Sequence, residues 1–101
     1  MTKRYEVVVS SRAEQMLASH ILFLARVSVN AARRLRDAYA ELLDDLEENP
    51  YIFPAAEEAN LPDGYRKALF GKRYQAVFCV ENNTVYLDAV LDCRKDNSAV
   101  F

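Results

Sequence analysis

The stretch RYQAVFCVENNTVYLDAVLD, residues 73–92, decides the fold class of this chain. Two segments rich in valine and aromatic residues flank Asn82-Asn83, a pattern typical of two antiparallel strands joined by a tight turn. A two-residue turn fixes which residues lie opposite each other, because side chains alternate between the two faces of a strand. On one face every opposed pair is then apolar: Val80 with Val85, Phe78 with Leu87, Ala76 with Ala89, and Tyr74 with Leu91. The hairpin therefore has one face suited to a hydrophobic core.

The opposite face of this hairpin has a mixed composition, and we expect it to be open to solvent. Its opposed pairs are Arg73 with Asp92, Gln75 with Val90, Val77 with Asp88, and Cys79 with Tyr86. Arg73 either forms an ion pair with Asp92 across the strands or is available to contact a target. The residues near 65–70 also follow a period of two and are followed by Gly71, which predicts a third strand and a turn.

Two helices are predicted upstream of these strands. A strand near residues 4–10 precedes Ser11, which has the spacing of a capping box with Glu14. The first helix then runs to about Val27, with an apolar stripe formed by Leu17, His20, Ile21 and Leu24. We interpret His20 as a core histidine with a local hydrogen-bond partner. Ser28 can cap a second helix that ends at Asn49-Pro50, and its apolar face includes Leu35 and Leu42.

The order of elements predicts an α+β fold in one domain spanning residues 1–101. An N-terminal strand and a two-helix hairpin are followed by a three-stranded antiparallel meander that packs on the helices. With 51% hydrophobic residues the chain has enough apolar mass for a core. The single histidine and two cysteines without a CxxC spacing argue against a metal site, and nothing indicates a cofactor. The apolar runs are too short for a signal peptide or a membrane span, so we expect a cytoplasmic protein.

The charges are segregated along the chain, although the net charge is only −2. Nine acidic residues and no Lys or Arg lie between Asp37 and Asp63, and a basic segment from Arg66 to Arg73 follows. The second helix has arginines in its first turns and acids in its last, which is the reverse of what the helix dipole favours. These charges either pair internally with the basic meander or contact a partner protein.

Several segments in this order resemble the RelE/ParE toxins of bacterial type II toxin-antitoxin systems. They are Val7-Val8-Val9-Ser10-Ser11-Arg12-Ala13, Asn30-Ala31-Ala32-Arg33-Arg34-Leu35, Gly64-Tyr65-Arg66-Lys67, Arg73-Tyr74-Gln75-Ala76-Val77-Phe78 and Ala89-Val90-Leu91-Asp92-Cys93-Arg94-Lys95-Asp96. The resemblance covers nearly the whole chain and implies a toxin that a cognate antitoxin neutralises by wrapping around it. Arg33, Arg34, Glu47 and Glu48 are the candidate antitoxin contacts.

The resemblance leaves two cellular targets open. In the branch that cleaves mRNA on the ribosome, basic residues on the open sheet face stabilise phosphate charge, and a C-terminal Tyr or His assists proton transfer. In the ParE-like branch, which is associated with poisoning DNA gyrase, these groups are largely missing. A toxin remnant that retains only antitoxin binding is a third alternative.

The residue-by-residue comparison favours the ParE-like branch. Arg66 and Arg94 match basic catalytic positions of the nucleases and are the candidate catalytic residues. Ala68, Gln75 and Asp92 replace a Lys, an Arg and a His, and the chain ends at Phe101 without a terminal Tyr. The candidate target contacts on the open face are Lys72, Arg73, Gln75 and Lys95. We therefore expect inhibition of gyrase, with ribosome-dependent mRNA cleavage as the alternative.

Overall fold

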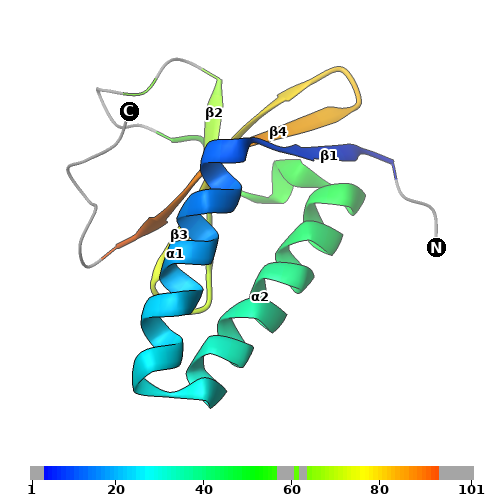
Figure 1. The fold of residues 1–101 in the computed structure, drawn as a ribbon. Helices are drawn as coiled ribbons and strands as arrows, with labels where there is room; N and C mark the ends of the chain where they lie inside the picture. The colour runs from blue at the N-terminus through cyan, green and yellow to red at the C-terminus, as the bar shows by residue number, and fades with distance from the viewer. Residues whose placement is uncertain (1–3, 57–60, 62–63, 94–101) are drawn as a thin grey trace.

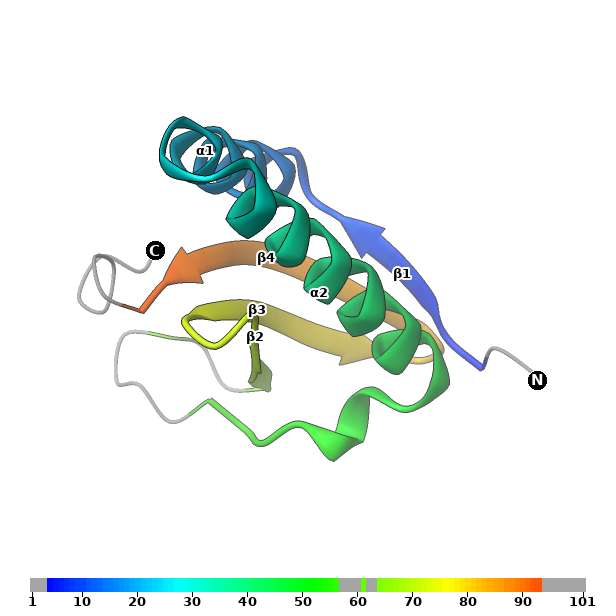
Figure 2. The ribbon, with the colours of Figure 1, turned by 90° about the horizontal axis from the view of Figure 1, so that it is seen from below.

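A four-stranded sheet covered on one side by a helical hairpin forms the fold. The computed structural model describes residues 4–56, 61 and 64–93. In chain order these form β1 (Glu6–Val9), α1 (Ser11–Val27), α2 (Val29–Glu48), the 3-10 helix η1 (Pro50–Ile52), β2 (Tyr65–Phe70), β3 (Tyr74–Glu81) and β4 (Thr84–Asp92). The strand order is β1-β4-β3-β2, and only β1 and β4 are parallel neighbours. Both helices lie on one side of the sheet (Figure 1, Figure 2), which confirms the predicted α+β class.

The N-terminal cap of α1 is Ser10, so the predicted capping box at Ser11 and Glu14 is wrong by one residue. Ser10 has an extended backbone, and its Oγ accepts a hydrogen bond from the Ala13 amide at 3.0 Å. Because β1 already ends at Val9, Ser10 is the last extended residue and Ser11 the first helical one.

The second helix has the predicted ends. Ser28 caps α2 by accepting a hydrogen bond from the Ala31 amide at 3.1 Å. At the other end Asn49 leaves the helical conformation, and its side chain accepts a hydrogen bond from the Tyr51 amide at 3.1 Å. The chain then continues into η1, where Pro50 occupies the first turn.

The core lies between the helical hairpin and the sheet, as predicted. Phe78 and Leu87 are fully buried at its centre, and Leu35 and Leu42 of α2 pack on it together with the partly buried Leu17 and Leu24 of α1. The loop after α2 contributes Phe53, whose ring lies edge-on to that of Phe78 at 6.1 Å.

A β-bulge makes the predicted register correct only near the β3–β4 turn. Phe78 lies opposite Leu87, but Val77 lies opposite Ala89, so Asp88 is an extra residue in β4. Beyond it the observed pairs are Ala76 with Val90, Gln75 with Leu91 and Tyr74 with Asp92. The predicted pairs Ala76–Ala89, Tyr74–Leu91, Gln75–Val90, Val77–Asp88 and Arg73–Asp92 are therefore wrong. The physical reason is that Ala89-Val90-Leu91 is apolar throughout, so either register buries an apolar side chain.

The edge of β4 extends beyond β1, and α1 covers it. The Ser10 amide donates to the Leu87 carbonyl at 3.0 Å, and the Ser10 hydroxyl donates to the Asp88 carbonyl at 3.1 Å. Nearly three turns further along α1, at about 3.6 residues per turn, His20 Nε2 lies 3.0 Å from the Val90 carbonyl oxygen. The half-buried His20 therefore has a hydrogen-bond partner, as expected, but that partner lies 70 positions away and is not local. The contact occupies a carbonyl that an exposed edge would leave free.

Residues 54–56 line the other edge of the sheet. The Ala56 amide donates to the Tyr65 carbonyl at 2.8 Å, and the Lys67 amide donates to the Pro54 carbonyl at 3.1 Å. Both edges of the sheet are thus partly covered by the chain itself. Within the described residues, no helix combines the length and apolarity that crossing a bilayer requires.

Candidate functional site

The sheet face turned away from the helices is the first candidate site, and we call it the open face. Alternation along each strand and the observed pairings assign its described residues. They are Glu6 and Val8 of β1, Tyr65, Lys67 and Leu69 of β2, Gln75, Val77, Cys79 and Glu81 of β3, and Thr84, Tyr86, Asp88, Ala89 and Leu91 of β4.

The open face is less open than its sequence predicted. Because the bulge turns Ala89 and Leu91 toward this face, they form a second apolar cluster with Val77, and all three are buried. Leu61, from the segment between η1 and β2, and Tyr65 pack against this cluster. The middle of the face is therefore a small second core and not an exposed polar surface.

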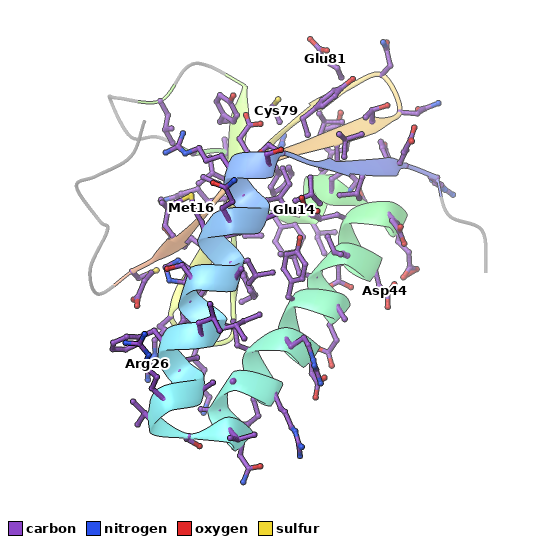
Figure 3. The ribbon with its side chains drawn as sticks, viewed as in Figure 1. Glu14, Met16, Arg26, Asp44, Cys79 and Glu81 are labelled. Carbon is purple, nitrogen blue, oxygen red and sulfur yellow. The ribbon has the colours of Figure 1, made fainter. Side chains whose placement is uncertain are left out.

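A tyrosine and an aspartate are joined on the open face by a short hydrogen bond. The Tyr65 hydroxyl donates to Asp88 Oδ2 at 2.5 Å, and this bond, together with burial and the Asp88 charge, raises the pKa of Tyr65 to about 12. Burial, with nearby Asp88 and Glu81, also raises the pKa of Cys79, which Figure 3 labels near the end of β3 beside Glu81. The phenol and the thiol are both neutral at pH 7, so neither is activated as a base or a nucleophile.

Lys67 is the cation that sequence reasoning missed on the open face. Among the described residues of that face it is the only Lys or Arg, whereas Glu6, Glu81 and Asp88 are acidic. It lies close enough to Cys93 to oppose the rise in the pKa of that thiol, which burial and Asp92 cause. The alternation of side chains along β2 was the available signal, since Lys67 is one residue away from Arg66, the residue that the sequence analysis selected.

Arg66, a predicted catalytic residue, lies on the helix side of β2. It is opposite Phe78 in the sheet, and its Nη1 donates to the Phe53 carbonyl at 2.6 Å. Its guanidinium also lies over the Tyr51 ring, 4.8 Å from the ring centre. Ala68 shares this side of β2 and is fully buried. Arg66 therefore anchors the loop after α2, away from the open face.

The other predicted target contacts do not form one cluster. Gln75 lies on the open face and is half-buried, whereas Lys72 and Arg73 are exposed in the turn between β2 and β3. Arg94, the second predicted catalytic residue, and Lys95, a predicted target contact, lie outside the described residues.

The predicted antitoxin contacts lie at opposite ends of α2. Arg33 and Arg34 are exposed in its first turns, and Glu47 and Glu48 are half-buried in its last turn. At 1.5 Å per residue the two pairs are about 20 Å apart. The Glu47 carbonyl accepts hydrogen bonds from the Arg4 and Tyr5 amides, both at 3.0 Å, so this end of α2 anchors the start of the chain.

The structure brings one predicted antitoxin contact together with two predicted target contacts. Arg34, Lys72 and Arg73 line a single cavity where the start of α2 meets the β2–β3 turn. The neighbouring end of the helical hairpin exposes four large apolar side chains, with exposed fractions from 47% to 77%: Leu22, Phe23, Val27 and Val29. No group of three or more His, Cys, Asp or Glu side chains occurs within the described part of the chain as a metal site would need.

The fold and these surfaces define a class of protein. It is a small α+β domain with a helical hairpin that exposes apolar and basic side chains, which is the composition of a protein-binding surface.

The comparisons identify the family within that class. The family model described as the ParE toxin of the type II toxin-antitoxin system, parDE, matches residues 7–97. The chain therefore belongs to the ParE toxin family of type II toxin-antitoxin systems, as the resemblance implied. Comparison with curated proteins gives no match.

Two solved structures share the fold at low sequence identity. A chain of the chromosomal ParDE toxin-antitoxin system from P. aeruginosa superimposes with a TM-score of 0.68 and 15% identity, covering 90% of this chain and 98% of that one. The YoeB dimer from Staphylococcus aureus superimposes with a TM-score of 0.54 and 13% identity, covering 85% of this chain and 93% of that one. The RelE-like arrangement of strand, helical hairpin and meander is common to all three.

Proposed function

We propose that this toxin acts through protein contacts, by inhibiting DNA gyrase, and that a cognate antitoxin neutralises it. The family to which the chain belongs supports the antitoxin, because the family is defined by a toxin-antitoxin pair. The resemblance to the ParE-like branch supports gyrase as the target.

The charge of the open face is the observation that carries the proposal. RNA cleavage requires oriented cations around the scissile phosphate, and removing one such group typically costs about 100-fold to 1000-fold in rate. The described open face offers Lys67 as its one cation, whereas Glu81 and Asp88 on the same face are acidic. Of the two described tyrosines on this face, Tyr65 and Tyr86, Tyr65 donates a hydrogen bond to Asp88 and has a pKa of about 12, so it is a poor acid at pH 7.

Induced expression in bacteria tests the proposal. We expect growth arrest with a DNA-damage response and intact message, and relief of the arrest when the antitoxin is co-expressed. The Lys67→Ala toxin, like the wild type, should leave mRNA intact. Arg36→Ala is the control variant, because it removes an exposed cation from α2. Codon-dependent message cleavage that Lys67→Ala abolishes and Arg36→Ala retains would favour the ribosome-dependent endonuclease instead. Antitoxin binding without any arrest would identify a toxin remnant.

A further inference from the structure

The cavity at the end of the helical hairpin has apolar walls and a basic rim. Leu24, Leu35 and Tyr74 provide its apolar surface, and its volume is about 280 Å³. This volume lies just below the roughly 300–1,000 Å³ typical of pockets for whole small molecules. The cavity therefore suits one or two side chains of a protein partner better than a cofactor.

Three cations from two separate segments surround this cavity. Arg34 comes from the second turn of α2, and Lys72 and Arg73 come from the β2–β3 turn, 38 positions further along the chain for Lys72. Among the residues that the structure describes, none that lines the cavity is acidic. In Figure 1 the yellow β2–β3 turn lies behind the lower half of α1, and Figure 3 shows Arg26 at the same end of the hairpin.

Like charges that converge on one site raise the electrostatic potential there, and their repulsion destabilises the folded protein while it has no partner. The exposed Asp37, three positions after Arg34, can offset part of this potential. The other acids of α2 lie further toward the opposite end of the helix, as Asp44 does in Figure 3, so they leave most of the potential in place. An anionic partner would relieve it.

We infer that this cavity binds an acidic, amphipathic segment of the antitoxin, with one apolar side chain in the cavity and flanking carboxylates on Arg34, Lys72 and Arg73. This inference rests on the proposed function, because it assigns a site to the antitoxin. The exposed Val27 and Val29 beside the cavity extend the apolar surface on which such a segment would lie. Arginine is suited to the contact because its planar guanidinium can bind a carboxylate through two parallel hydrogen bonds.

The test is calorimetric titration of the full-length toxin with its cognate antitoxin. Arg34→Glu is compared with Arg33→Glu, the adjacent exposed arginine that does not line the cavity. We expect Arg34→Glu to weaken binding at least about tenfold, and Arg33→Glu to weaken it by less than about fivefold. Ala31→Phe, which fills the cavity without changing charge, should also weaken binding about tenfold, and this loss should persist at high salt.

Four outcomes have distinct meanings. Larger losses for Arg34→Glu and Ala31→Phe than for Arg33→Glu support the site. Equal effects of the two arginine variants, with unchanged melting temperatures, overturn it while leaving the proposed function intact. Failure of the wild-type toxin to bind the antitoxin overturns the proposed function and the site together. A short labelled single-stranded DNA that binds the wild type but not Arg34→Glu, with antitoxin affinity unchanged, makes the cavity a nucleic-acid site and overturns the inference.

Discussion

Replacing Ser10 by alanine should destabilise this fold more than replacing any other helix-capping serine. Ser10 Oγ makes two hydrogen bonds: it accepts one from the Ala13 amide at 3.0 Å and donates one to the Asp88 carbonyl at 3.1 Å. The first caps α1, and the second ties that cap to the bulge in β4. Loss of the side chain therefore affects a helix and a sheet edge together.

The magnitude follows from these two bonds. A serine cap is worth about 1 kcal/mol, and a lost hydrogen bond to a partly buried carbonyl adds roughly 0.5–1.5 kcal/mol. We expect Ser10→Ala to lower the free energy of unfolding by about 2 kcal/mol. In a domain of this size that corresponds to a fall in Tm of roughly 8–16 °C.

Two other serines provide matched controls. Ser28 also caps a helix, by accepting from the Ala31 amide, so Ser28→Ala should cost about 1 kcal/mol. Ser11 is exposed in the first turn of α1, so Ser11→Ala should stay within about 0.5 kcal/mol. Thermal and urea unfolding, followed by circular dichroism, measure all three variants. A loss for Ser11→Ala as large as that for Ser10→Ala would refute the assignment of the cap and restore the capping box at Ser11.

Three further predictions concern single side chains. The stability that the Tyr65–Asp88 hydrogen bond contributes should be fully present below pH 10.0, the ordinary pKa of tyrosine, and lost as the pH approaches about 12, because the folded state holds the tyrosine proton more tightly. The urea midpoint of the wild type should therefore fall across this pH range. An equal fall for Tyr65→Phe would contradict the prediction. Gly71→Ala should cost about 1–2 kcal/mol, since φ is +58° and the new Cβ would meet Leu35 Cδ1 at 3.3 Å; an unchanged urea midpoint would show that the turn adopts another conformation. Arg66→Ala should cost about 2 kcal/mol through loss of its contacts with the loop after α2; a drop in toxicity at unchanged stability would instead give this arginine a role at the target.

The elements of the fold were predictable because their signals are local. The serine at position 28 caps α2, Asn49-Pro50 ends it, and Asn82 and Asn83 separate β3 from β4, all as the sequence indicated. The bulge at Asp88 was not predictable, since the apolar residues that follow it fit either register. That single extra residue converts the middle of the expected open face into a second core.

The candidate site was less predictable, because its parts come from distant segments. Lys67 was missed through an error of one position on β2, where Arg66 faces the helix side instead of the open face. The meeting of Arg34 with Lys72 and Arg73 depends on how the helical hairpin packs against the β2–β3 turn. No spacing along the chain encodes that contact.

Titration of purified toxin into a DNA gyrase supercoiling reaction tests the central claim most directly. We predict that the toxin inhibits supercoiling in proportion to its concentration, and that prior addition of the antitoxin restores it. A parallel reaction with programmed ribosomes should leave the message intact, since the described open face carries one cation, Lys67. Unimpaired supercoiling at saturating toxin, with message cleaved in the ribosome reaction, would contradict the claim.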